Sequence, residues 1–485
     1  MSHHLSPLAV SMLAIGGTIG TGLFFSVSTL LARGPLTTLA SMLYVALIVV
    51  VVLQTAGELA AKFPETGLIC RFQYMFLGRA AGLANSIVYW ISWGLTFALE
   101  LSLVVSIVRF WFPHSDSQNL TIVFVVWATL TAFNLLPVDI YGQIEYWMAL
   151  VKVLAILVWI VVVMVSLVAQ NRFFSVWTDH WPQSFIGGQT SGTRFVVDLV
   201  NSLVFLSFLF QSVESVAISM RDIDNPRKLV RQIMRVVFVR IVVFYLVSVF
   251  LLSLSIPYLD PKLKLPELQN LLSSPFLIAL QNLGYQENWD LLSLFNFVIL
   301  TAILLAANSN VYFGSRYLQS MVETEANTTR FAFLARTNSK NVPVAAVLST
   351  AAFGAVALLL KFHSISVVFN FLLTCCALAG MLMWCLLSIL YVRYSYALEK
   401  QCLPWNRYRR YGAMWALASM IVILGCCGLE TFYLFSVLSL VGAYMTVAVF
   451  LVAYACLGGG YVPLEEIDLG ELIFTDAEYG SVCER

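Results

Sequence analysis

The chain has 485 residues, of which 60% are hydrophobic and only 11% are charged, with 27 Lys and Arg against 26 Asp and Glu. Soluble globular domains carry about 25% charged residues, so this composition excludes a soluble protein and predicts one that crosses a lipid bilayer many times. The near-zero net charge also excludes the basic surface that nucleic-acid binding needs. No nucleic-acid partner is therefore expected.

The apolar runs predict an all-α polytopic membrane protein with about twelve transmembrane helices, since one span needs about 20 mostly apolar residues. We expect residues 1–6 to form a short N-terminus, residues 7–457 a membrane core and residues 458–485 a C-terminal tail. Lys and Arg concentrate on the side of the predicted loops that carries both termini, which places the termini in the cytoplasm. The predicted spans are Pro7–Leu31, Pro35–Ala60, Ala80–Phe112, Thr121–Val138, Ile144–Val168, Phe195–Met220, Val236–Pro257, Leu291–Tyr312, Val342–Leu360, Ile365–Val392, Tyr411–Leu429 and Tyr433–Leu457.

The first run contains four glycines close together, Gly16, Gly17, Gly20 and Gly22. Each glycine weakens a helix by about 1 kcal/mol relative to alanine, and a loosened membrane helix survives only where it faces protein or water. One interpretation is a break in the helix at mid-membrane. The alternative is a close helix crossing, which small residues four apart also permit. The spacing alone leaves both open.

A second unusual segment lies inside the sixth run, where Gln211, Ser212, Glu214 and Ser215 interrupt an apolar stretch. A buried glutamate at this depth costs several kcal/mol unless it is paired or hydrated. The first and sixth runs hold equivalent places in two five-helix halves, residues 7–168 and 195–392, with two additional helices at 411–457. Interrupted helices at equivalent places are typical of inverted-repeat transporters, with the binding site between the repeats. This favours a break in both helices.

An ordered set of segments resembles the motifs of the fungal amino-acid permeases (the yeast amino-acid transporter family) within the amino acid, polyamine and organocation superfamily. The segments span most of the predicted membrane core. They include GGTIGTGLF (Gly16–Phe24), GELAAKFPETG (Gly57–Gly67), YGQIEYWMALVKV (Tyr141–Val153), VESVAISMRDIDNPRK (Val213–Lys228), AANSNVYFGSRYL (Ala306–Leu318) and LPWNRYRRYGAMWAL (Leu403–Leu417).

The resemblance implies a transporter that imports L-amino acids by proton symport, with a five-plus-five inverted repeat and broken helices 1 and 6. The substrate carboxylate is then expected at the backbone N–H groups of the first break, as at other helix N-termini. The substrate ammonium is expected at backbone carbonyls of the sixth helix, with an aromatic gate at Phe208, for which ordinary core packing is the alternative. The substrate-binding residues so implied are Gly20, Thr21, Gly22, Phe208, Phe210, Gln211, Ser212 and Val213.

Two charged residues are candidates for proton coupling. Glu214 aligns with a family glutamate on the sixth helix, and its alternative role is a structural hydrogen bond that holds the unwound segment. Lys152 lies in the fifth span, where related proton-coupled carriers use a lysine in place of a sodium ion. A lysine on a flexible stem can gain and lose a proton when buried, or it can snorkel to the membrane surface. Asn308 and Ser309 of the eighth span are expected as supporting polar partners of Lys152.

Other functions are less well supported by the sequence. The five histidines are scattered, and no HExxH, GxSxG or phosphate-loop motif is present, so we expect no enzyme, catalytic residue, cofactor or metal. A non-transporting amino-acid sensor built on a permease fold is the alternative function. The expected partners are an L-amino acid, protons and the lipid bilayer. The expected location is the fungal plasma membrane, with the vacuolar membrane as the alternative.

Overall fold

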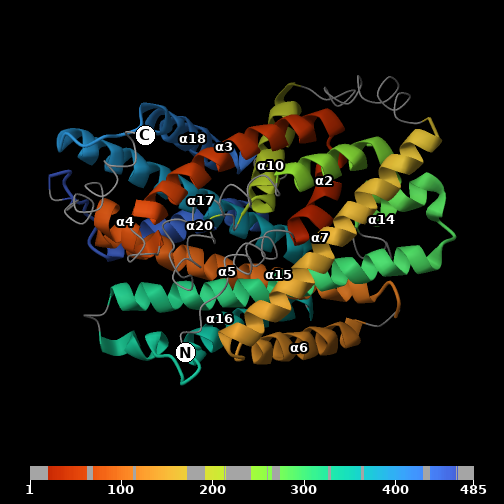
Figure 1. The fold of residues 1–485 in the computed structure, drawn as a ribbon, viewed down its shortest axis with the longest axis horizontal. Helices are drawn as coiled ribbons and strands as arrows, with labels where there is room; N and C mark the ends of the chain where they lie inside the picture. Colours follow the sequence, from red (N-terminus) through yellow and green to blue (C-terminus); the bar gives the residue numbers. More distant parts are fainter. Residues whose placement is uncertain are drawn as a thin grey trace, which may run out of the picture.

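The computed structural model describes residues 20–62, 69–112, 116–171, 192–211, 214, 242–258, 260–264, 274–325, 329–361, 365–429, 437–465 and 467. Within these ranges the chain is almost entirely helical and forms no strand (Figure 1). The start of the first predicted span and the segment 215–241 lie outside the described residues.

Five helices of the described part are long and apolar enough to cross a membrane, in Pro35–Leu59, Arg79–Val108, Ile140–Ala169, Trp289–Thr324 and Val367–Lys400. They belong to α3 (Pro35–Lys62), α5 (Arg79–Val108), α7 (Val138–Ala169), α15 (Trp289–Thr324) and α17 (Ile365–Lys400). The shorter apolar helices are α2 (Val27–Leu31) with the π-helical turn η1 (Gly22–Ser26), α6 (Asp116–Phe133), α10 (Gly192–Leu209), the helix Val242–Ser255, α16 (Val344–Ala351) with the 3-10 helix η5 (Ala352–Lys361), α18 (Arg407–Cys426) and α20 (Val437–Cys456).

The helix bounds differ from the prediction in two instructive ways. First, α15 continues past Tyr312 to Thr324, because polar residues such as Arg316 and Gln319 end the apolar run without ending the helix. Second, short helices escaped prediction because an apolar-run criterion finds only segments long enough to span a bilayer. These are α4 (Ile69–Leu77), α13 (Pro261–Lys264), α14 (Pro275–Leu280), η3 (Gln281–Tyr285) and η4 (Thr329–Ala335).

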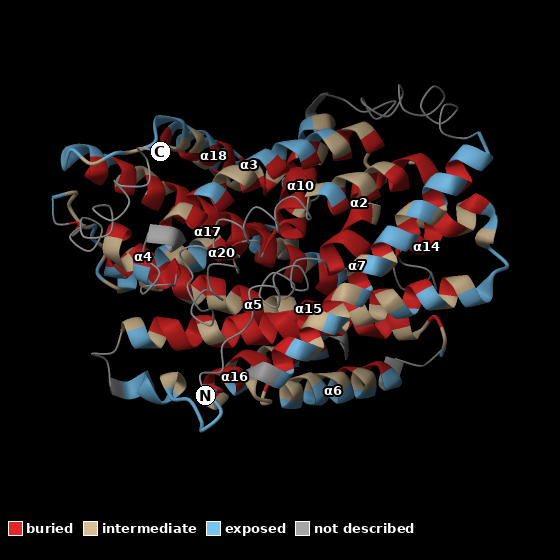
Figure 2. Cartoon of the chain, viewed as in Figure 1, coloured by how far each residue is buried: buried red, intermediate tan, exposed pale blue. Residues whose placement is uncertain are grey.

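Helices α5 and α17 occupy the centre of the bundle. In the most apolar 18-residue stretch of each helix, 89% is buried in α17 and 78% in α5, against only 28% in α7. Helix α5 packs against α15, α4 and α17, and α17 also packs against α10, α18 and α20. Figure 2 shows the contrast between the red central helices and the pale blue outer residues of α7. Side chains presented from α5 and α17 therefore lie in the interior.

Helix α7 shows its apolar side to the outside of the molecule. Val151, Leu154, Val158 and Val161 are each more than half exposed, whereas Lys152 on the opposite side is 1% exposed. A large exposed apolar surface marks contact with a membrane or another protein, and intramembrane charges face the interior of the bundle. The residues of α7 are therefore distributed as in a membrane helix, with valines and leucines on the lipid-facing side and a charged residue on the inner side.

Candidate substrate and proton site

The predicted break in the first span coincides with a local change of helix type. Residues Gly22–Ser26 form a π-helical turn, and Phe24 donates its backbone N–H to the carbonyl of Gly20 at 3.3 Å. Single π turns inside helices are frequent at functional sites. The irregular backbone thus lies at the glycines that the sequence singled out, of which Gly16 and Gly17 fall outside the described residues.

Gly20 and Gly22 also allow neighbouring helices to approach closely. A Cβ atom on Gly20 would lie 2.8 Å from Cβ of Ala306 in α15, and a Cβ on Gly22 would lie 2.9 Å from Cα of Leu209 in α10. Leu209 of α10 therefore occupies the position that a side chain at residue 22 would need. The described glycines thus fit both interpretations of the cluster, an irregular turn and a close helix crossing.

Thr21 connects the irregular turn to α5. Its hydroxyl donates a hydrogen bond to Oε2 of Glu100, a carboxylate only 3% exposed. Thr21 was expected at the site, but Glu100 was not. A carboxylate in an apolar helix is retained only where other groups pair with it, so Glu100 marks the polar end of the first break.

The end of α10 forms the second interrupted segment. The helix stops at Leu209, well before the predicted end at Met220, and Gln211 donates its backbone N–H to the carbonyl of Phe208 at 3.1 Å. Phe208 is 7% exposed. The ring of Phe210 packs against Tyr245 with centroids 5.3 Å apart, so this side chain belongs to the core, and only its backbone remains a candidate for substrate contact. Ser212 and Val213 lie outside the described residues.

The Gln211 side chain is held between two central helices. Its Nε2 donates to Oγ of Ser92 in α5 at 3.1 Å, and a Cβ on Gly380 of α17 would lie 3.0 Å from its Cγ. Its Oε1 has no hydrogen-bond partner among the described residues. The glutamine therefore presents a buried acceptor at the end of α10, where a polar partner is needed.

Glu214 is completely buried and receives hydrogen bonds from two different helices. Tyr89 of α5 donates its hydroxyl to Oε1, and Trp384 of α17 donates its indole N–H to Oε2 at 3.0 Å. Each carboxylate oxygen thus has its own donor. This geometry supports the structural hydrogen bonds expected of Glu214, and it also links the sixth segment to both central helices.

Lys152 is buried on the inner side of α7, where two carboxylates act on its charge. The charges that act on its ammonium group are those of Glu145, two turns earlier on the same helix, and Glu100 of α5. A lysine that is 1% exposed does not snorkel to a surface. The snorkelling alternative is therefore wrong for this structure.

Asn308 and Ser309 both form hydrogen bonds to Glu145, two turns before Lys152 on α7. Asn308 donates from Nδ2 to Oε1 of Glu145 at 2.7 Å, and the Ser309 hydroxyl lies 3.3 Å from the same oxygen. The Tyr141 hydroxyl donates to this oxygen at 2.9 Å. These three residues thus contact a carboxylate whose charge acts on Lys152, and the sequence analysis did not include Glu145.

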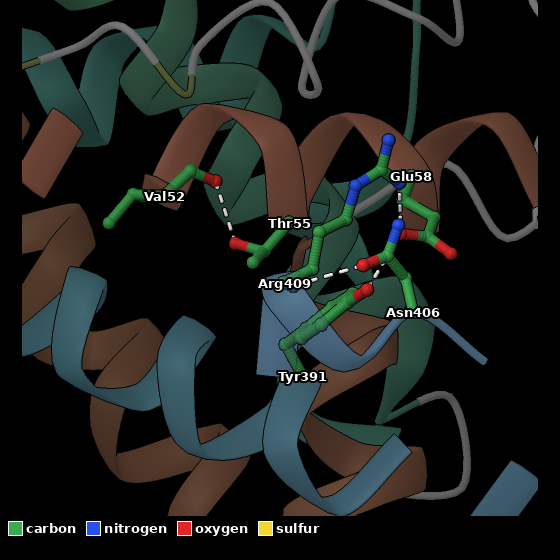
Figure 3. Close-up of polar contacts among 6 residues, drawn as sticks. All are labelled: Val52, Thr55, Glu58, Tyr391, Asn406 and Arg409. Carbon is green, nitrogen blue, oxygen red and sulfur yellow. Dashed lines mark hydrogen bonds and ion pairs between the residues drawn. The ribbon is translucent and has the colours of Figure 1, made fainter. Parts of the chain in front are cut away.

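A fourth acid within a predicted span, Glu58 of α3, is held by α17 and α18. Figure 3 shows its carboxylate between Arg409 of α18 and Tyr391 of α17. The Tyr391 hydroxyl donates to Oε2 at 2.7 Å, and Arg409 forms an ion pair with the same oxygen. Asn406 caps α18 by accepting the backbone N–H of Arg409 at 3.1 Å. This cluster joins three helices and has the character of a structural contact.

The residues that sequence reasoning missed carried a visible signal. Glu100 and Glu145 are charged residues inside long apolar helices, and such residues are functional candidates by default. Glu145 and Lys152 are seven residues apart, which is two helical turns on one face. A search for charged pairs at this spacing would have found Glu145, whereas the contact of Glu100 with Thr21 joins distant parts of the chain and needs the fold.

Apolar outer helices, two interrupted segments and buried charges between them define an integral membrane transporter of the all-helical class. The chain belongs to the amino acid permease family, whose sequence profile matches residues 9–458. This confirms the resemblance drawn from the motifs.

Three relatives illustrate the match. The chain is 34% identical to a lysine-specific permease of Saccharomyces cerevisiae, over 92% of this chain and 73% of that protein. It is 34% identical to a lysine/arginine permease of Candida albicans, over 97% of this chain and 85% of that protein. It is 27% identical to a lysine-specific permease of Lactococcus lactis, over 95% of this chain and 91% of that protein. Because such relatives are permeases, the expectation that the protein is not an enzyme is confirmed.

The fold is also similar to a solved transporter. A manganese transporter of Eremococcus coleocola superposes with a TM-score of 0.55 at 15% sequence identity, over 93% of each chain. At this identity the likeness concerns the helical fold alone. It agrees with the bundle seen in Figure 1.

Proposed function

We propose that the protein imports L-amino acids with a cationic side chain by proton symport and alternating access. The names of the fungal relatives, lysine-specific and lysine/arginine permease, suggest this substrate class. The buried charges agree with it, because Glu100, Glu145 and Glu214 outnumber Lys152 among the charged site residues described above. Carboxylates in a low-dielectric interior favour a cationic ligand.

One observation carries the proposal: both interrupted segments are connected to the same helix. On α5, Tyr89 bonds Glu214 of the sixth segment, and Glu100 bonds Thr21 of the first. Tyr89 and Glu100 are eleven residues apart, which is three turns on one helix face. A substrate that moves either segment therefore acts on one shared helix, which gives the two breaks a common element through which alternating access can couple them.

Within this proposal the substrate lies between η1 and the end of α10. Its carboxylate meets the backbone near Gly20, Thr21 and Gly22, where helix N–H groups attract an anion. Its α-ammonium meets the carbonyls from Phe210 to Val213, with Phe208 as the gate. The Oε1 atom of Gln211 offers a further acceptor for an ammonium group.

The membrane arrangement belongs to the same proposal. About twelve spans form two inverted five-helix halves with two further helices, and both termini lie in the cytoplasm. Lys152 takes the place of a coupling cation and releases its proton during each cycle. The fungal plasma membrane is the proposed location.

The experiment is uptake of radiolabelled L-lysine by a permease-deficient yeast strain that expresses the protein. We expect uptake that unlabelled arginine inhibits and that a proton uncoupler abolishes, without a requirement for sodium. Binding of lysine without uptake would instead indicate a sensor.

A further inference from the structure

Glu145 has an unusual division of hydrogen bonds between its two carboxylate oxygens. Three donors converge on Oε1: the Tyr141 hydroxyl at 2.9 Å, Asn308 Nδ2 at 2.7 Å and the Ser309 hydroxyl at 3.3 Å. Oε2 has no hydrogen-bond partner among the described residues, although the side chain is completely buried. A buried acceptor without a partner is costly, so this oxygen requires an explanation.

The orientation of the donors is fixed by a second residue. Asn134, which follows α6, donates from Nδ2 to Oδ1 of Asn308 at 2.7 Å. Because Oδ1 of Asn308 is occupied as an acceptor, its Nδ2 is the group that faces Glu145. Oε1 is therefore saturated with donors, and a proton arriving at this carboxylate has only Oε2 to bind.

A positive charge that acts on this carboxylate lies on the same helix. Lys152 lies two turns after Glu145 on the same face of α7, and helix side chains lean toward the N-terminus, here toward Glu145. The ammonium group interacts electrostatically with Glu145 and with Glu100 of α5. The other titratable groups around the carboxylate are Tyr141 on α7 and, stacked on it at 4.6 Å, Tyr312 of α15.

We propose that Glu145 is the residue that accepts the proton from Lys152 and carries it toward the end of α7 at Val138. A bridging water gives one proton to Oε2 of Glu145 and takes one from Nζ of Lys152, so that an ammonium and a carboxylate become an amine and a carboxylic acid. The proton leaves Oε2 for bulk water when that end of the bundle opens. This inference rests on the proposed proton symport.

The position of Glu145 along the helix fits a relay. At 1.5 Å per residue, Glu145 lies about 10 Å from the start of α7, whereas Lys152 lies about 21 Å from it. The relay therefore halves the distance that water must penetrate to collect the proton. A purely structural carboxylate would bridge α7 and α15 equally well wherever it lay along the helix.

The test compares proton-driven accumulation with substrate exchange in proteoliposomes for the wild type, Glu145→Gln and Tyr141→Phe. Glutamine keeps an oxygen for the three donors and replaces Oε2 by an NH2 group that accepts no proton. Phenylalanine at position 141 removes one donor and leaves Oε2 intact. Glu58→Gln is the matched control, since it makes the same chemical change in an acid remote from Lys152.

We expect Glu145→Gln to retain exchange and to lose accumulation by roughly a hundredfold, as removal of a proton-transfer group does. Tyr141→Phe and Glu58→Gln should still accumulate lysine when a pH gradient is imposed, and Glu145→Asp should restore part of the coupling.

Two results would overturn the inference. Wild-type accumulation by Glu145→Gln would show that Oε2 carries no proton. Loss of exchange in both Glu145→Gln and Tyr141→Phe would show that the carboxylate only joins α7 to α15. If accumulation by the wild type did not respond to the pH gradient, the proposed symport would be wrong together with the relay. Loss of accumulation in Glu145→Gln alone is a different result, because the wild type then still couples lysine to protons.

Discussion

Thr21 at the irregular turn of the first span donates its hydroxyl to Glu100 of α5, so the first break is held by a buried carboxylate. On the same face of α5, Tyr89 holds Glu214. The two contacts make α5 the common support of both interrupted segments, and they change which acidic residues should matter for transport.

Glu214→Gln and Glu100→Gln should both impair uptake strongly, because each side chain accepts a hydrogen bond across an interrupted segment. Glu214 was a coupling candidate from the sequence, whereas Glu100 became one only through its contact with Thr21. Loss of one charge-assisted hydrogen bond is worth about 2 kcal/mol, which corresponds to a roughly 30-fold fall in kcat/KM for uptake.

Glu58→Gln provides the comparison for these variants. It should lower the free energy of unfolding by about 1 kcal/mol through its ion pair with the partly exposed Arg409, with little change in uptake kinetics. Initial rates of lysine uptake, normalised to surface expression, measure all three. Equal kinetics for Glu214→Gln and Glu58→Gln would contradict a special role for the sixth segment.

Gly22→Val should destabilise the protein as well as abolish uptake, because the added side chain meets the backbone of Leu209. Overpacking of this kind costs about 1–3 kcal/mol. The measurement is the thermal midpoint of the detergent-solubilised protein together with lysine binding. Gly425→Ala is the matched control, since nothing lies within 4 Å of a Cβ at that position. A stable Gly22→Val protein that no longer binds lysine would instead favour an open backbone site at Gly22.

Lys152→Arg should stop net uptake while leaving substrate binding intact, because arginine keeps its proton at any physiological pH. Lys152→Ala removes both charge and proton and should permit at most exchange that no longer responds to pH. Accumulation, exchange and binding in proteoliposomes separate these outcomes. Wild-type accumulation by the Arg variant would leave Lys152 as a structural charge.

The Arg79–Glu325 ion pair predicts a pH-dependent contribution to stability. Arg79 donates to both carboxylate oxygens of Glu325, at 3.0 and 2.8 Å, and these hydrogen bonds lower the pKa of Glu325 below its usual value. In the unfolded chain the pKa of Glu325 is about 4.3. Because its pKa is lower in the folded protein, the ion pair stabilises the fold at pH values above about 4.3, and this stabilisation is lost as the pH falls through the lowered pKa. Because Arg79 is exposed, the effect is about 0.5 kcal/mol.

The corresponding measurement compares thermal midpoints of the wild type and Glu325→Gln as a function of pH. The two midpoints should differ near neutral pH and converge in acid. A difference that persists unchanged below the lowered pKa would assign the effect to something other than the carboxylate charge.

The helical class could be predicted from the sequence, because apolar runs leave local signals, and the glycine cluster marked the place of the irregular π turn at Gly22–Ser26. The end of α10 at Leu209 and its close approach to Gly22 could not, since both depend on how distant helices meet. Lys152 was identified correctly as a buried charge, but its carboxylate partners were missed. The hydrogen bond from Asn308 to Glu145 was not foreseen, because residue spacing gives the position of a side chain and not its hydrogen bonds.

The central claim, proton-coupled import of a cationic amino acid, is tested most directly by lysine accumulation in proteoliposomes that contain the purified wild-type protein. We predict that an inward proton gradient, imposed without sodium, drives labelled lysine above its equilibrium level, and that an uncoupler releases the excess. Lysine that only equilibrates across the membrane, with a rate that does not change with the proton gradient, would contradict the account.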